Sequence, residues 1–197
     1  MKVKICGITT YKDAIDAINA GADALGFVFY EKSPRYISPQ NAKSIIQKLP
    51  PFIEKVGLFV HEEPKNINLI CRDTKLTLAQ IHFETEDSFF KKLETPYLQV
   101  LRAKSKEEIL TLQKDRFYLI DSFVDSFGGS GKRVELSWFD DVDCSKFIIA
   151  GGLNIDNINE VKKHNFYAID VSSGVEKEKG IKDKEKMIEL IRRVKID

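Results

Sequence analysis

The strongest constraint on the fold is a regular alternation of two hydrophobic patterns along the chain. Short runs rich in β-branched and aromatic residues, typical of buried strands, are each followed by a stretch with the apolar spacing of an amphipathic helix. Eight strands are predicted, at residues 3–6, 24–29, 55–60, 78–82, 97–102, 117–121, 146–150 and 168–171. Eight helices are predicted to follow them, at residues 11–20, 39–49, 64–72, 87–93, 106–113, 136–142, 155–164 and 183–194. Because repeated strand–helix units place successive strands parallel, the pattern predicts a parallel sheet covered by helices.

The length of the chain favours a closed barrel. Its 197 residues leave about 25 for each unit, enough for a strand of about five residues, a helix of about ten and two short loops. We therefore expect a (β/α)8 TIM barrel, α/β in class, with residues 1–197 forming a single domain at the small end for this fold. A doubly wound open sheet is the alternative, but it usually has fewer strands, and no G-x-G-x-x-G turn follows the first predicted strand.

Composition excludes several classes of partner. With 31 basic and 30 acidic residues and a formal charge of +1, the chain has no broad basic field for a nucleic acid or an anionic bilayer. No signal-peptide pattern is seen, and no apolar run approaches the roughly 20 residues that span a membrane. The three cysteines are widely spaced and lack a C-x-x-C pair, which argues against disulfides and a thiolate metal site. We expect a cytoplasmic protein.

Residues at the carboxyl ends of the strands carry the functional signal, since the loops after the strands build the active site of such a barrel. Cys6 ends the first predicted strand, and Gly7 lets the backbone turn so that the thiol faces the mouth. Asp121 ends the sixth strand after four largely apolar residues. Taken alone, Cys6 could be a small buried apolar residue and Asp121 a solvated loop carboxylate. If the two side chains face each other across the mouth of the barrel, they would form an acid–base pair that can move protons on a sugar.

Arg35 is a candidate for binding an anionic group or for supporting the general acid. It lies in the loop after the second predicted strand, and Pro34 favours a defined backbone there. A surface arginine without a function is the competing interpretation.

Three glycine-bearing stretches follow the last three predicted strands, at residues 127–132, 150–154 and 172–174. Barrels commonly bind phosphate through the loops after strands seven and eight, where backbone N–H groups approach the phosphate oxygens. A plain turn explains any one stretch, but all three on one rim predict a phosphate site.

Metal catalysis is not expected. His61, His82 and His164 do not have the spacing of metal ligands. The remaining cysteines, Cys71 and Cys144, are expected to be structural.

Several motifs, in order along nearly the whole chain, resemble those of phosphoribosylanthranilate isomerases. They are KICGIT at residues 4–9, FVFY at 27–30 with SPRY at 33–36, GLFV at 57–60, QIH at 80–82, FGGSGK at 127–132, AGGL at 150–153, DVSSGVE at 170–176 and GIKD at 180–183. KICGIT and DVSSGVE together are highly specific for the family.

The resemblance implies an isomerase of tryptophan biosynthesis. The reaction would be the Amadori rearrangement of N-(5-phosphoribosyl)anthranilate to 1-(2-carboxyphenylamino)-1-deoxy-D-ribulose 5-phosphate, with no cofactor. By family pattern Cys6 is the general base and Asp121 the general acid, while Arg35, Gly7 and His82 contact the substrate. The phosphate loops would comprise Gly129, Gly131, Gly151, Gly152, Ser172, Ser173 and Gly174. Family members occur as monomers or homodimers, and the sequence does not decide between them.

Two positions depart from the family pattern. Phe83 follows His82 where the family usually has glycine, which changes that part of the mouth. Ile155 replaces a common proline and affects how the next helix begins.

Two other functions compete with this interpretation. One is the related sugar-phosphate isomerase of histidine synthesis, but its two halves are alike and its first strand ends in aspartate, where this chain has Cys6. The other is a non-catalytic phosphosugar-binding barrel, which would need phosphate loops without an aligned acid and base.

The proposed chemistry sets two electrostatic requirements. An unperturbed aspartic acid is protonated in only about one molecule in a thousand at pH 7, so a partly apolar mouth must raise the pKa of Asp121. The unperturbed thiol is only a few per cent ionised, and a cation or helix N-terminus beside Cys6 would help.

Overall fold

Eight parallel strands close into a barrel in the computed structural model, which describes residues 1–112, 115–122 and 134–196. The strands are hydrogen-bonded in chain order, and β8 pairs with β1. They are β1 (Lys2–Cys6), β2 (Ala24–Val28), β3 (Glu54–Phe59), β4 (Leu78–Ile81), β5 (Tyr97–Ala103), β6 (Tyr118–Ser122), β7 (Phe147–Ile149) and β8 (Ala168–Val171). The predicted (β/α)8 barrel is therefore confirmed, and the open sheet is excluded.

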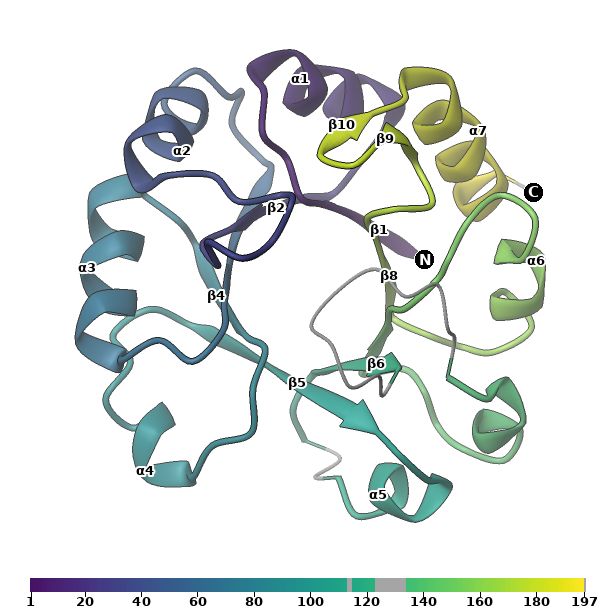
Figure 1. Cartoon of the computed structure of the whole chain (residues 1–197). Coiled ribbons are helices and arrows are strands. Elements are labelled where there is room, and N and C mark those ends of the chain that lie inside the picture. The colour runs from purple at the N-terminus through teal and green to yellow at the C-terminus, as the bar shows by residue number, and fades with distance from the viewer. Residues whose placement is uncertain (113–114, 123–133, 197) are drawn as a thin grey trace.

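Helices surround the barrel (Figure 1). They are α1 (Tyr11–Ala20), α2 (Pro39–Ile46), α3 (Pro64–Thr74), α4 (Asp87–Phe90), α5 (Lys106–Leu110), a 3-10 helix η1 (Leu136–Phe139), α6 (Ile158–Val161) and α7 (Lys184–Lys195). The α1 helix has the predicted bounds, because Thr10 caps its first turn and Gly21 ends it at φ 102°. No helix in the described part of the chain is long and apolar enough to cross a membrane.

The α6 helix is much shorter than predicted. The Asn154 side chain accepts the backbone N–H groups of Asp156 and Asn157, at 2.9 and 3.2 Å. This turn occupies the segment where the helix was expected to begin, so α6 starts only at Ile158. Ile155, which replaces the family's proline, lies within the same turn.

A small antiparallel hairpin was not predicted from the sequence. Strands β9 (Glu176–Glu178) and β10 (Ile181–Lys182) pair outside the barrel, and Figure 1 shows them between α1 and α7. Gly180 turns between them at φ 85°, and its carbonyl accepts the Thr9 hydroxyl at 2.6 Å. The hairpin therefore connects the segment after β8 to the loop after β1.

Strand alternation separates two apolar regions. Successive side chains of a strand point to opposite faces, so Val3 and Ile5 of β1 pack outward, in the large cluster that also contains helix residues. A smaller cluster fills part of the barrel interior, formed by Leu98, Val100, Leu119 and Ala150. Lys4 and Cys6 share the inward face of β1 by the same alternation.

The barrel interior also contains a buried ion pair. Lys4 Nζ lies 2.8 Å from Asp170 Oδ2, and both side chains are less than 10% exposed. The strand register accounts for the contact, because Lys4 is directly opposite Asp170 in the β1–β8 ladder. Charges this deep require close partners, so these two side chains hold each other in place beneath the strand ends.

Candidate active site

Cys6 lies at the carboxyl end of β1, with only 5% of its surface exposed. The register places it opposite Gly26 of β2. A Cβ atom at Gly26 would lie 2.7 Å from the Cys6 sulfur, so glycine leaves the space that the thiol occupies. The side chain is thus fixed within the strand ends rather than free in a loop.

The pKa of the Cys6 thiol is raised from its ordinary value. Burial is the largest cause, and the Asp170 carboxylate adds to it, while the Lys4 and Lys182 ammonium groups act in the opposite direction. A cation was expected to favour the thiolate, and two act on it, Lys4 and Lys182. Desolvation nevertheless outweighs the two ammonium groups, so the pKa of the thiol stays above its ordinary value.

Asp121 occupies the corresponding place on β6. Its Oδ1 atom accepts the Ser122 backbone N–H at 2.8 Å, and its side chain is 22% exposed. The pKa of Asp121 is raised to about 6; burial is the largest cause and the Asp170 charge adds to it, while hydrogen bonds from Ser122 and the charge of Arg102 act in the opposite direction. The predicted elevation of this pKa has a physical cause in the fold.

Asp170 links the two candidate residues electrostatically. Its carboxylate raises the pKa of both Cys6 and Asp121, so both lie within range of the same buried charge. Its second oxygen, Oδ1, is buried and makes no hydrogen bond to the part of the protein that the structure describes. No role for Asp170 was predicted from the sequence, although this residue opens the DVSSGVE motif.

His82 and Arg102 complete the surroundings of Asp121. His82 Nε2 lies 3.4 Å from Asp121 Oδ2, and Arg102 is opposite Asp121 in the β5–β6 ladder. Burial lowers the pKa of His82 to about 4, with Arg102 and Lys4 contributing, so the imidazole is neutral near pH 7. Arg102 was missed from the sequence, although alternation with Leu98 and Val100 places it on the inward face.

The loop after β7 packs directly on the candidate acid. A Cβ atom at Gly151 would lie 2.7 Å from Asp121 Oδ1 and 2.7 Å from Ser122 Oγ, and Gly151 has φ 88°. Only glycine fits this combination of left-handed backbone and close approach. The Gly152 carbonyl accepts the Asn157 side chain at 2.9 Å, which holds the rest of the loop.

The loops after β7 and β8 are joined to each other. Gly174 forms a parallel bridge with Asn154, and a Cβ atom at Gly174 would lie only 1.8 Å from the Leu153 carbonyl oxygen. Ser172 is partly exposed and Ser173 is exposed beside this contact. The structure therefore brings together the second and third glycine-bearing stretches; Gly129 and Gly131, in the first, lie outside the described residues.

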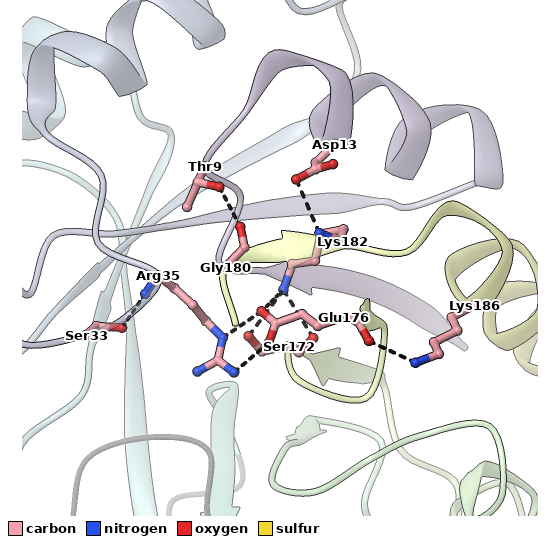
Figure 2. Close-up of polar contacts among 9 residues, drawn as sticks. All are labelled: Thr9, Asp13, Ser33, Arg35, Ser172, Glu176, Gly180, Lys182 and Lys186. Atoms are coloured by element: carbon pink, nitrogen blue, oxygen red, sulfur yellow. Dashed lines mark hydrogen bonds and ion pairs between the residues drawn. The ribbon is translucent and has the colours of Figure 1, made fainter. Parts of the chain in front are cut away.

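Arg35 is buried and paired, not a free surface arginine. It is 8% exposed, and its Nε and Nη2 atoms donate to the two Glu176 carboxylate oxygens at 2.7 and 2.8 Å (Figure 2). Gly7 lies under it, since a Cβ atom at Gly7 would be 2.6 Å from Arg35 Cδ. The Cys6 thiol is among the groups that raise the pKa of Arg35. Arg35 therefore lies on the Cys6 side of the mouth, and the arginine acting on Asp121 is Arg102.

Other candidates from the sequence lie away from this site or remain structural. Cys71 and Cys144 are buried, with 1% and 0% of their surfaces exposed. Within residues 1–112, 115–122 and 134–196, no group of three or more His, Cys, Asp or Glu side chains is arranged to hold a metal ion. His61 and His164 instead lie against aromatic rings.

A cavity of about 850 Å³ lies at the opposite end of the barrel. Residues at the amino ends of the strands line it, among them Ala24, Glu54, Leu78 and Tyr97. It contains none of the candidate catalytic or phosphate-binding residues. Chemistry in this fold occurs at the carboxyl ends of the strands, so Cys6 and Asp121 at those ends mark the site better than the size of this cavity does.

Fold and strand-end chemistry together define a (β/α)8-barrel enzyme with its polar groups at the carboxyl ends of the strands. A family model described as N-(5'phosphoribosyl)anthranilate (PRA) isomerase matches residues 3–193. The chain belongs to this family.

Similar proteins agree over the full length. The chain is 59% identical to an N-(5'-phosphoribosyl)anthranilate isomerase from Nitratiruptor sp., with 100% of each chain covered. It is similar to a crystal structure of phosphoribosyl anthranilate isomerase in complex with reduced 1-(o-carboxyphenylamino)-1-deoxyribulose 5-phosphate, with 34% identity, TM-score 0.84 and coverage of 99% and 98%. It is also similar to a structure of monomers generated from the dimeric isomerase of Thermotoga maritima, with 32% identity, TM-score 0.86 and coverage of 99% and 98%.

Proposed function

We propose that this chain, as a single barrel domain over residues 1–197, catalyses the Amadori rearrangement of N-(5-phosphoribosyl)anthranilate. The step belongs to tryptophan biosynthesis and yields 1-(2-carboxyphenylamino)-1-deoxy-D-ribulose 5-phosphate. Family membership supports the reaction. The observation that carries the mechanism is a buried thiol and a carboxyl of raised pKa, both in the field of Asp170.

Asp121 acts as the general acid. In its protonated form it donates to the furanose ring oxygen, and the ring opens to an iminium at C1 as the anthranilate nitrogen supplies the electron pair. With a pKa of about 6, roughly one carboxyl in ten is protonated at pH 7. Holding the proton then costs about 1.4 kcal/mol rather than the roughly 4 kcal/mol of an unperturbed aspartate.

Cys6 acts as the general base. Its thiolate removes the C2 proton of the iminium, which gives an enolamine that becomes the ketone of the product. Burial opposes the thiolate, while Lys4 and Lys182 favour it. The cationic iminium adds a further positive charge near the sulfur at the moment when the proton is transferred.

Substrate binding is assigned to the surrounding loops. Gly151, Gly152, Ser172, Ser173 and Gly174 would bind the phosphate, supported by the contact between their two loops and by the partial or full exposure of these residues. Gly129 and Gly131 belong to the same assignment. Arg35, Gly7 and His82 would contact the rest of the substrate.

Assembly and location follow from the family. The dimeric relative from Thermotoga maritima supports a homodimer, with a monomer as the alternative, and we place the enzyme in the cytoplasm. Sedimentation of the purified chain distinguishes the two assemblies.

A turnover assay tests the function. Freshly generated phosphoribosylanthranilate is fluorescent, and its signal should decay far faster with the protein than spontaneously. Decay at the spontaneous rate, with the phosphosugar still bound, would instead indicate a non-catalytic binding barrel.

A further inference from the structure

Lys182 is a buried cation that the mechanism above does not use. It lies on β10, and its side chain is 0% exposed. Its ammonium group donates to Glu176 Oε1 at 2.9 Å, to the Ser172 carbonyl at 3.1 Å and to Ser172 Oγ at 3.4 Å. One side chain therefore contacts a predicted phosphate loop and the carboxylate that holds Arg35.

Glu176 is the shared partner of two cations. Its carboxylate lies between Arg35 and Lys182, as Figure 2 shows, and is 5% exposed. Burial alone would raise the pKa of Glu176, but the hydrogen bonds from Arg35 and Lys182 hold it below its ordinary value. The carboxylate stays charged, and it fixes the positions of both cations.

Three side chains from neighbouring segments hold the backbone of the hairpin in place. Asp13 Oδ2, in the first turn of α1, accepts the Lys182 backbone N–H at 3.3 Å. Thr9 contacts the Gly180 carbonyl, and Lys186 Nζ donates to the Glu176 carbonyl at 2.9 Å. The hairpin is thus anchored at both ends, which makes the position of the Lys182 side chain well defined.

Buried charges of both signs lie on this side of the mouth. Three cations, Lys4, Arg35 and Lys182, accompany three carboxylates, Asp13, Asp170 and Glu176, and all six residues are less than 10% exposed. Asp121 on β6, Arg102 on β5 and His82 after β4 also lie near the carboxyl ends of the strands. Among the buried charges, Lys4 and Lys182 favour the Cys6 thiolate, and Asp170 opposes it.

We propose that Lys182 is a positioning residue of the isomerisation, fastening the Ser172 loop to the Glu176–Arg35 pair and placing a positive charge that favours the Cys6 thiolate. This rests on the proposed role of Cys6 as the base. Lys182 acts through other groups and does not itself transfer the proton.

A titration of Cys6 tests the proposal without relying on catalysis. The ultraviolet absorbance of thiolate is followed against pH, and the same titration of Cys6→Ser is subtracted, which isolates this thiol from Cys71 and Cys144. Lys182→Met should raise the midpoint of the Cys6 titration by about half a pH unit or more, because a positive charge that favours the thiolate is lost. Glu176→Gln should lower it, and the double variant should return near the wild-type midpoint.

The sign pattern separates electrostatics from mere structural damage. Lys182→Met breaks one buried ion pair and Glu176→Gln breaks two, so both variants should lower the melting temperature, yet they should move the midpoint of the Cys6 titration in opposite directions. Lys177→Met, an exposed lysine on the same hairpin, is the matched control and should leave the midpoint unchanged. If Lys182→Met does not fold, the direction in which Glu176→Gln moves the Cys6 midpoint still tests the proposal, because a lower midpoint is expected.

Kinetics provide the second measurement. Lys182→Met should lower kcat about tenfold and raise KM severalfold, because the Ser172 loop loses its anchor. An unchanged Cys6 midpoint in Lys182→Met, or shifts of the same sign in both single variants, overturns the proposal. If Cys6→Ser retains normal turnover, the role of Cys6 as base fails instead, which is a separate result from the titration.

Discussion

Gly151 and Asp121 are in such close contact that no side chain fits between them. A Cβ atom at position 151 would lie 2.7 Å from Asp121 Oδ1. The loop after β7 therefore fixes where the carboxyl points and how much water reaches it, and both determine its pKa.

Gly151→Ala should lower both stability and turnover. The alanine methyl group would displace the Asp121 carboxyl, and φ 88° is unfavourable for any residue with a Cβ. We expect a loss of about 1–3 kcal/mol in the free energy of unfolding and at least a tenfold fall in kcat. Urea denaturation and the fluorescence assay measure the two effects.

Gly21→Ala is the matched control for backbone strain. Gly21 has φ 102°, but a Cβ atom there would meet only the Ile191 side chain, at 3.4 Å, away from the carboxyl ends of the strands. This variant should lose stability and keep its turnover. Equal losses of turnover in the two variants would show that strain, not the position of Asp121, accounts for the effect.

Cys6→Ser should reduce kcat by at least about a hundredfold while the substrate still binds. A serine hydroxyl has almost the same size but is a far weaker acid than a thiol, so the alkoxide base is not available near neutral pH. Single-turnover kinetics and substrate binding measure the two quantities. Cys71→Ser, at a buried position outside the site, should affect stability alone, and near-normal turnover in Cys6→Ser would remove this residue from the mechanism.

Asp121→Asn should also lower kcat by at least about a hundredfold, because the amide has no proton to donate to the ring oxygen. The mechanism needs Asp121 protonated and Cys6 ionised, and the pKa of Asp121, about 6, lies below the raised pKa of Cys6. In the wild type, kcat should therefore rise with pH below about 6 and level off above it, where loss of the Asp121 proton offsets the gain of thiolate. A pH profile of kcat checks this, and a flat profile from pH 5 to 8 would contradict the assignment.

Asp121 and His82 should act on stability in opposite directions between pH 4 and pH 6.5. The folded pKa of Asp121 is raised to about 6, so its stabilising contribution is present below its ordinary pKa and is lost as pH rises through 6. The folded pKa of His82 is lowered to about 4, so its contribution is present above its ordinary pKa and is lost as pH falls through 4.

The two variants should therefore diverge. As the pH rises from 4 to 6, the free energy of unfolding of Asp121→Asn should increase relative to wild type by on the order of 2 kcal/mol. For His82→Gln the free energy of unfolding should increase relative to wild type as the pH falls over the same range. Unfolding free energies from urea titrations at several pH values give both differences. Parallel stability curves for all three proteins would show that neither group has a shifted pKa.

Phe83 should matter for packing more than for chemistry. Its ring lies 5.3 Å from Phe89 in an edge-to-face contact and 5.4 Å from His61. Phe83→Ala should lower the free energy of unfolding by about 1–3 kcal/mol and change turnover only severalfold. The control is Phe52→Ala, since Phe52 is fully exposed and should contribute no measurable stability. A hundredfold loss of turnover in Phe83→Ala would place its ring in the substrate site.

Local patterns were sufficient for the barrel but not for the hairpin or the ion pairs. The α1 helix could be bounded to the residue because its cap and its terminating glycine are both local signals. Strands β9 and β10 have three and two residues, too few to show any periodicity. They form only because the loop after β1 and the α1 helix provide partners for them.

The ion pair of Arg35 shows why contacts between distant segments could not be predicted from the sequence. Glu176 is 141 positions away in sequence, and nothing near Arg35 predicts it. In contrast, Arg102 could have been found, since strand alternation alone places it on the same face as Leu98 and Val100. Positions that depend on one strand were predictable, and contacts between distant loops were not.

The bridge between Gly174 and Asn154 has a consequence for affinity. Because the last two loops of the barrel are already in contact before any ligand arrives, the entropy cost of ordering them is met during folding. A small anion meeting this surface would find its shape preorganised, so even a modest number of backbone contacts could hold it.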